Sequence, residues 1–162
     1  NDSFAMPKFT ERQKAYAHAE GSKMIYTPQI IVGGRDRVEG NSPNAVMGAI
    51  KAQLGVAPAV MLTAERQGDQ VIIRAEANPP LSKPARVEVV RYTDRSEVEI
   101  ERGENAGMQV MYHNIVTDWD DVGGWSGRDA LEMTAQASGD APVVVIIQTE
   151  GPGEILAAVR LK

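Results

Sequence analysis

The chain has 162 residues, of which 43% are hydrophobic and 24% are charged, and its net charge is −5. This composition is normal for a soluble globular protein and excludes wholesale disorder. The acidic balance disfavours a nucleic-acid surface, which needs clustered Lys and Arg. The sequence has no cysteine, so it cannot form disulfides, thiolate nucleophiles or cysteine–zinc sites. Its longest strongly apolar run, 143–147, is far shorter than a membrane span.

The first predicted element is a helix over residues 10–20. Thr10 and Gln13 form a capping-box pattern at its start, and Gly21 suits its end. The apolar stripe of this segment is thin. We therefore expect the helix to need a partner surface that the chain barely supplies.

A hairpin and a second helix follow. Residues 29–32 are typical of a short buried strand, Gly33-Gly34 of a tight turn, and residues 35–38 of the returning strand. Pro43 suits the first position of a helix over residues 43–54. A lone hairpin is marginal in water, so we expect further strands to pair with residues 29–32. They would come from residues outside this sequence, from the β-rich part or from another chain.

The rest of the chain predicts strands separated by turns. The loop at 78–84 contains three prolines and cannot lie inside a sheet. Strand spacing of this kind suggests an antiparallel sandwich. Alternation predicts that Val71, Ile73, Val87, Val89, Val98 and Ile100 share one core. The predicted strands cover residues 60–66, 70–77, 87–92, 97–101, 108–116, 130–137, 143–149 and 154–161.

Four separate strings carry a family resemblance. The order Thr27-Pro28, strand, glycine turn, strand and capped helix is that of the closing half of a thioredoxin fold. The chain also resembles domain of unknown function family 1223, from about Phe4 onward. The strings are FTERQKAY at 9–16, YTPQIIV at 26–32, RGENAG at 102–107, and Trp119 with Gly123-Gly124-Trp125.

The resemblance implies an α+β fold, with the C-terminal half of a thioredoxin-like fold at 1–57 and an antiparallel β-sandwich-like domain at 58–162. It implies a cis Thr27–Pro28 bond beside the redox site and a periplasmic or secreted location. The family normally begins with a strand leading into Cys-x-x-Cys, and no residue here corresponds to those cysteines. We therefore expect a missing N-terminal segment or another chain to complete the thioredoxin-like sheet.

Two loops supply the candidate binding residues. Thr27 and Pro28 could present backbone groups to a peptide, as in thioredoxin-like proteins, or Pro28 could merely shape a turn. Glu104 and Asn105, bracketed by glycines, could lie beside a ligand. The alternative is a plain hairpin connection, for which Asn and Gly are suited.

The remaining polar residues predict no catalytic, metal or cofactor site. Asp118, Asp120 and Asp121 fail the spacing of a calcium loop and are typical of a solvated acidic turn. His18 and His113 show no metal-ligand spacing. Trp119 and Trp125 are expected to be buried anchors rather than a ligand platform, and no phosphate-loop or nucleophile-elbow motif is present.

The sequence leaves two functions open. In the first, the chain is the visible part of an exported thioredoxin-like protein with thiol–disulfide chemistry in its full-length form, and is itself redox-inactive. In the second, it is a non-enzymatic binding or structural module that works through its β domain. The expected partner is a protein or peptide in either case, not nucleic acid.

Overall fold

The computed structural model describes residues 4–104 and 106–161. Within these residues the chain forms two helices and nine strands, so the expected mixed class with antiparallel sheets is confirmed. The elements are α1 (Pro7–Ala19), β1 (Gln29–Val32), β2 (Asp36–Glu39), α2 (Pro43–Leu54), β3 (Val60–Gln67), β4 (Gln70–Ala77), β5 (Ala85–Glu99), β6 (Gln109–Trp125), β7 (Leu131–Gln136), β8 (Val143–Thr149) and β9 (Ile155–Leu161).

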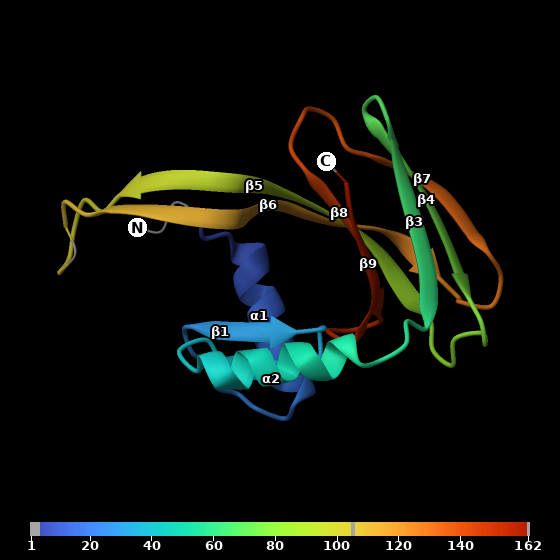
Figure 1. Cartoon of the computed structure of the whole chain (residues 1–162), viewed down its shortest axis with the longest axis horizontal. Coiled ribbons are helices and arrows are strands. Elements are labelled where there is room, and N and C mark those ends of the chain that lie inside the picture. The colour runs from blue at the N-terminus through green and yellow to red at the C-terminus, as the bar shows by residue number, and fades with distance from the viewer. Residues whose placement is uncertain (1–3, 105, 162) are drawn as a thin grey trace.

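Two antiparallel sheets form the β-rich part. One has the order β3-β4-β7 and the other β6-β5-β8-β9 (Figure 1). Their inner faces share one core, to which β4 contributes Val71 and Ile73, and β8 contributes Val145 and Ile147. The prediction that Val71, Ile73, Val87 and Val89 share one core is therefore confirmed.

Strand β8 is apolar on both faces because both faces are covered. Val143, Val145 and Ile147 point into the core between the sheets. Ile146 and Gln148 lie on the other face and are also buried. A strand with this composition is expected inside a sheet, and β8 does lie between β5 and β9.

Strands β5 and β6 are much longer than the sequence predicts. Residues predicted as three separate strands and a following turn region form two continuous strands of 15 and 17 residues. Only Ala85 to Arg91 of β5 also pair with β8. From Tyr92 onward β5 pairs with β6 alone, and the two project from the body as a ribbon (Figure 1).

The ribbon corrects one part of the predicted core. Val98 and Ile100 lie on the projecting part and are half-buried, outside the core between the sheets. Their alternation correctly predicts that they share one face of a strand. The sequence pattern does not show that the pairing of β5 with β8 ends at Arg91.

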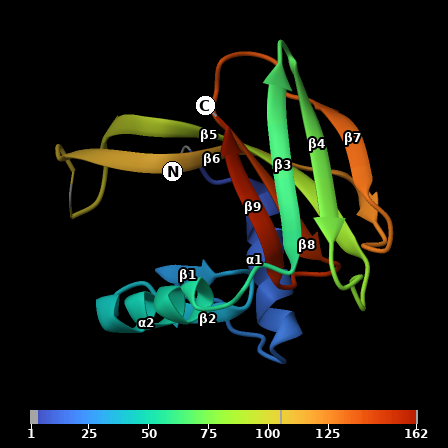
Figure 2. The same ribbon diagram turned by 45° about the vertical axis from the view of Figure 1, so that its right-hand side comes forward.

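Helix α2 and the hairpin lie below the sandwich, and α1 runs from them alongside the four-stranded sheet (Figure 2). α1 begins at Pro7 rather than Thr10, and Gln13 donates to the Tyr26 carbonyl oxygen (3.2 Å) instead of closing a capping box. The expectation that the chain barely supplies a partner surface for α1 is wrong. Its Tyr16 and Ala17 are buried where the helix meets the four-stranded sheet.

The hairpin β1–β2 is a two-stranded sheet in the described part of the chain. The β domain does not add a strand to it, so that source of the expected pairing is excluded here. Pairing with residues outside this sequence or with another chain stays a prediction. Neither described helix is long and apolar enough to cross a membrane.

We predict that Ile73→Ala lowers the free energy of unfolding by about 2–5 kcal/mol, because it opens a cavity at a fully buried position. Ile100→Ala serves as the matched control and should cost clearly less, since Ile100 is half-buried on the ribbon. Urea denaturation measures both. Equal losses would contradict the placement of the core.

Candidate functional site

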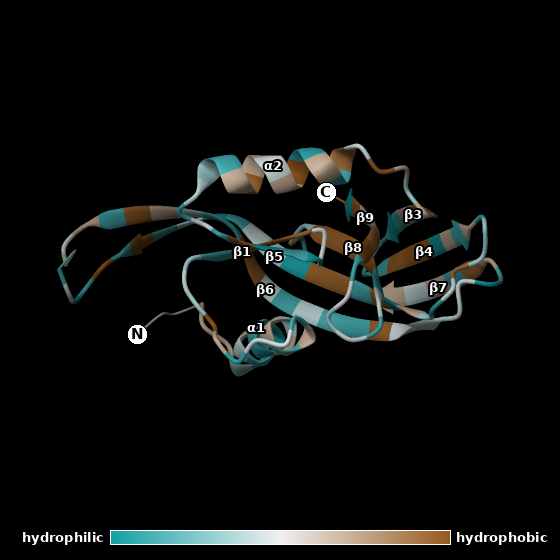
Figure 3. Ribbon diagram, turned by 90° about the horizontal axis from the view of Figure 1, so that it is seen from below, coloured by the Kyte–Doolittle hydropathy of each residue, from teal (hydrophilic) through white to brown (hydrophobic). Residues whose placement is uncertain are grey.

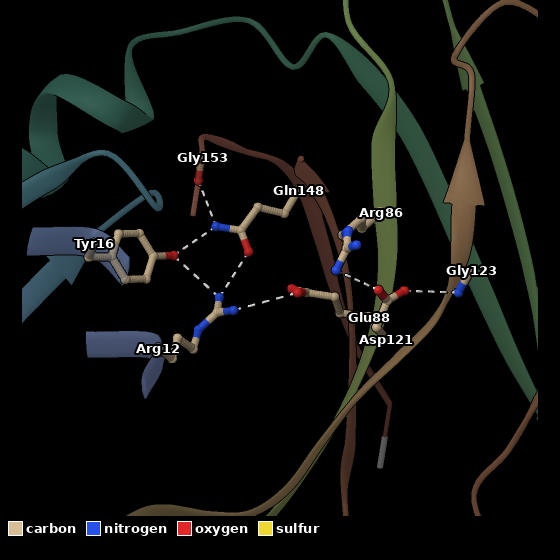
Figure 4. A network of polar contacts seen from close by, with 8 residues as sticks. All are labelled: Arg12, Tyr16, Arg86, Glu88, Asp121, Gly123, Gln148 and Gly153. Carbon is tan, nitrogen blue, oxygen red and sulfur yellow. Dashed lines mark hydrogen bonds and ion pairs between the residues drawn. The ribbon is translucent and has the colours of Figure 1, made fainter. Parts of the chain in front are cut away.

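The most developed polar cluster joins α1 to the four-stranded sheet (Figure 4). Arg12 Nη2 donates to Gln148 Oε1 (2.8 Å) and to the Tyr16 hydroxyl oxygen (3.3 Å). Arg12 Nη1 lies 3.5 Å from Glu88 Oε1. The guanidinium also stacks on Trp119, 3.7 Å from the ring centre, where cation–π attraction adds to the ion pair.

Gln148 is the hub of this cluster. Its side chain comes from the end of an apolar strand and is 1% exposed. Gln148 Nε2 donates to the Tyr16 hydroxyl oxygen (2.7 Å) and to the Gly153 carbonyl oxygen (2.6 Å). Because the amide both donates and accepts, it links α1 to the turn between β8 and β9.

The same turn receives the tip of the hairpin. Ile155 N–H donates to the Gly33 carbonyl oxygen (2.8 Å). Gly34 has φ 71°, and a Cβ there would lie 2.3 Å from the Gly153 carbonyl oxygen. Both the backbone conformation and the close approach therefore require glycine at position 34. An ion pair between Arg35 and Glu154 (3.7 Å) borders the contact.

Two buried polar atoms of the cluster have no partner among the described residues. They are Glu88 Oε2 and Trp119 Nε1. Glu88 is 7% exposed, so its carboxylate depends on Arg12 for compensation. The contacts of the cluster fix the orientation of α1 against the four-stranded sheet.

The Thr27–Pro28 loop lies at the start of β1 and is exposed. The predicted cis peptide bond between these residues is confirmed. Gly40 N–H donates to the Pro28 carbonyl oxygen (2.9 Å), which fixes the loop to the hairpin. Exposed apolar side chains flank it at Ile25 and Ile30, 44% and 38% exposed. Peptide binding at this loop stays a prediction.

The second candidate loop is the turn at the tip of the ribbon. Gly107 N–H donates to the Ile100 carbonyl oxygen (2.7 Å), so the loop serves as the hairpin connection. Glu104 is exposed there, and Asn105 lies outside the described residues. No hydrogen bond or ion pair in the described part joins Glu104 to Thr27 or Pro28, so the structure does not bring the two candidate loops together.

The three aspartates do not form the predicted turn, because they lie within strand β6. Asp118 pairs with Lys8 and Asp121 with Arg86. The hydrogen bond from Lys8 lowers the pKa of Asp118, while desolvation and the neighbouring Asp118 charge raise the pKa of Asp120. No group of three or more acidic or histidine side chains in the described residues could hold a metal ion.

Other polar candidates stay apart. His18 is exposed on α1 and His113 is exposed on β6. Trp125 is the buried anchor that the sequence predicts, and its Nε1 donates to the Asp129 carbonyl oxygen (2.8 Å). An open cavity of about 370 Å³ lies beside the β8–β9 turn, lined by Leu81, Ser82, Lys83, Thr149, Glu154 and Leu156.

Sequence reasoning missed the residues of the central cluster. Gln148 ends the apolar run of β8, and Glu88 interrupts an apolar stretch of β5. Each is a polar residue at a position where both faces of the strand are covered. A polar residue at such a position signals a buried polar contact, but it does not identify the partner. The partner of both residues is Arg12 of α1, which lies 76 residues from Glu88 and 136 residues from Gln148 in the sequence.

We predict that Arg12→Ala lowers the free energy of unfolding by about 1–3 kcal/mol, because it leaves the Glu88 carboxylate and the Gln148 carbonyl without their donor. Adding Glu88→Gln should recover part of the loss by removing the buried charge. Lys14→Ala, which breaks an exposed pair with Glu11, is the control and should change stability by about 0.5 kcal/mol or less. Denaturation of the four proteins tests this, and equal losses for Arg12→Ala and Lys14→Ala would contradict it.

A second prediction concerns pH. The pKa of Asp118 lies below its ordinary value of 3.8, so its pairing with Lys8 favours the folded state above that pH and is lost as the pH falls through the folded pKa. Lys8→Met should raise the pKa of Asp118 toward 3.8. Carboxyl chemical shifts followed by NMR against pH measure this. An unchanged midpoint would show that Lys8 does not hold the carboxylate in solution.

One family model and one solved structure match most of this chain. The family model described as "Protein of unknown function (DUF1223)" matches residues 1–148. An X-ray structure of a protein from Agrobacterium tumefaciens is 28% identical with a TM-score of 0.81, and the match covers 99% of this chain and 72% of that chain. A hypothetical protein from Pyrococcus horikoshii is 11% identical with a TM-score of 0.27, over 64% of this chain and 88% of that chain, which carries no structural argument. No curated protein matches.

The fold, and the polar cluster that joins α1 to the four-stranded sheet, therefore define a class of mixed helical and antiparallel β proteins whose function is unknown. The chain belongs to the DUF1223 family.

Proposed function

We propose that this chain supplies the closing half of a thioredoxin-like domain at 1–57, followed by a β domain at 58–162. The full-length protein would be exported and would act on thiols or disulfides. The chain itself has no cysteine. In this proposal its role is to stabilise the thioredoxin-like domain and to bind a peptide substrate at Thr27 and Pro28. The observation that carries the proposal is an incompletely covered layer formed by α2 and the hairpin.

Helix α2 has no buried residue over its 12 positions. Met47 is 51% exposed and Leu54 is 81% exposed. Short helices are marginal in water and draw their stability from burying an apolar face. A layer of this composition is expected to be covered in the full-length protein.

The outer edge of hairpin strand β1 is also uncovered, because half of its backbone groups have no partner in β2. Gly40 N–H donates to the Pro28 carbonyl oxygen, and antiparallel pairing alternates between bonded and non-bonded pairs. The backbone groups of Gln29 and Ile31 therefore point away from β2. An uncovered row of this kind is a template for another strand.

The order of elements supports a thioredoxin-like completion. A helix, two antiparallel strands and a second helix follow one another, and α1 and α2 lie on opposite sides of the hairpin (Figure 3). Thr27-Pro28 stands immediately before the first strand, where thioredoxin-like proteins bind the peptide backbone. Export to the periplasm or beyond rests on the family resemblance alone.

The second candidate function is a non-enzymatic binding module in the β domain. The ribbon of β5 and β6 favours it, because a projecting two-stranded arm exposes apolar side chains at Met108, Met111 and Tyr112. Such an arm suits protein contact without any chemistry.

The test uses the full-length protein encoded by the reading frame that contains this sequence. We expect a Cys-x-x-Cys before Asn1 and reduction of insulin disulfides by the full-length protein. Replacing both cysteines by serine is the control and should abolish the activity. Absence of the motif, or an inactive protein that contains it, would favour the binding module.

We further predict that Thr27→Arg raises KM for a disulfide-bonded peptide about tenfold, equivalent to about 1.4 kcal/mol. A bulky charge at this exposed position would obstruct the peptide without disturbing the core. Thr63→Arg, at an exposed threonine of β3, is the matched control and should leave KM unchanged. Steady-state kinetics measure both, and equal KM values for the two variants would argue against peptide binding at Thr27.

A further inference from the structure

We propose that residues 109–113 of strand β6 pair antiparallel with the same segment of a second copy of this chain, about a twofold axis at Met111. The two ribbons would then form one four-stranded sheet in the order β5-β6-β6-β5. This inference concerns self-association, so it goes beyond the proposed function and does not depend on its thiol chemistry.

Strand β6 has an open edge along the ribbon. It is an edge strand of the four-stranded sheet, and in the described part of the chain it pairs with β5 alone. The ribbon projects from the body, so this edge is approachable (Figure 1). The side chains of Gln109, Met111, Tyr112 and His113 are exposed. An edge of this kind is a template for pairing with another chain.

The hydrogen-bond pattern shows which backbone groups of β6 face outward. Ile100 N–H donates to the Met108 carbonyl oxygen (2.9 Å), which marks these two residues as a hydrogen-bonded pair. Hydrogen-bonded and non-hydrogen-bonded pairs alternate along an antiparallel ladder. The register does not shift from this pair as far as His113. The backbone groups of Gln109, Met111 and His113 therefore point away from β5.

This part of the edge lacks the residues that usually block edge pairing. Residues 109–113 contain no Lys, Arg, Asp, Glu or Pro, whereas β6 carries the ion-paired Asp118 and Asp121 further along. The opposite edge of the ribbon, residues 93–99 of β5, has four charged residues. Because charged side chains on an edge strand oppose pairing, segment 109–113 is the favoured edge of the ribbon.

Two residues with positive φ set the limits of the segment. Gly107 has φ 84° and Asn114 has φ 53°, and neither value belongs to an extended strand. The uninterrupted strand between them has Met111 at its centre. A twofold axis at Met111 therefore uses the whole segment in both copies.

This register places matching groups opposite one another. The outward backbone groups of Met111 meet the same groups of the second copy, and those of Gln109 meet those of His113. Val110 lies opposite Tyr112 in a non-hydrogen-bonded pair, where side chains approach most closely. An aromatic residue opposite a β-branched one stabilises a sheet. The contact uses the same patch on both copies, so it closes at two.

The first test measures association of the 162-residue chain by sedimentation velocity over a range of concentrations. We expect a reversible dimer. Met111→Pro should lower the association constant about tenfold, because it removes two symmetry-related hydrogen bonds but none between β5 and β6. Glu97→Pro is the matched control, since Glu97 lies opposite Met111 and its N–H faces the other edge. It should leave association unchanged. Met111→Lys keeps every backbone group and should also weaken the dimer, because it adds a charge to the edge.

A single cysteine tests the register, because the chain has none of its own. The Cα atoms of a hydrogen-bonded pair lie about 5.5 Å apart, within the range of a disulfide. With oxidised glutathione, Met111→Cys should form a covalent dimer about tenfold faster than Met61→Cys. Met61 is 74% exposed on β3 and serves as the control.

Three results would overturn the proposal. The first is a chain that stays monomeric even at about 1 mM. The second is a dimer that Met111→Pro and Met111→Lys leave intact; if Ile31→Pro abolishes that dimer, the association belongs to the open edge of β1. The third is equal cross-linking of Met111→Cys and Met61→Cys, which would show that Met111 does not lie at the axis.

Discussion

The buried amide of Gln148 is the contact on which the arrangement of this protein depends. A polar side chain that loses water must find partners inside the protein, and leaving one unsatisfied costs about 1–3 kcal/mol. Gln148 finds them in Arg12 and Tyr16 of α1 and in the backbone of Gly153. Helix α1 and the end of β8, which are far apart in sequence, must therefore meet at one point of the sheet.

This requirement ties the two parts of the chain together. The turn that accepts the Gln148 hydrogen bond at Gly153 also receives Gly34 of the hairpin at a distance that leaves no room for a side chain. Arg12 neutralises the Glu88 carboxylate on the neighbouring strand. The division into 1–57 and 58–162 stays a prediction about domains, and the contacts between them are those of a packed polar interface rather than of a flexible linker.

The sequence predicts much of the local structure but little of the polar cluster that joins α1 to the four-stranded sheet. Strand β8 and helix α2 were predicted with the bounds that the structure shows, because an apolar run and a Pro43–Gly55 frame are local signals. The start of α1 was misplaced because Pro7 opens the helix before the capping pattern at Thr10.

The long-range errors have a common cause. Alternation showed which side chains of β5 share a face, but not where the neighbouring strand stops, so Ile100 was assigned to the core. For the same reason, the sequence analysis does not identify Gln148 as a point of contact with α1. A strand pattern gives the face of a residue, whereas its environment depends on which distant element covers that face.

The tip of the ribbon also divides the chain in an unusual way. Apart from the small hairpin β1–β2, each sheet combines strands that precede the turn at 102–107 with strands that follow it. Strands β3, β4 and β5 come from the first part, and β6 to β9 come from the second. Exposed loop tips are where proteases nick a chain most readily. A single cut in this turn would leave two interlocked fragments, each of which needs the other to build both sheets.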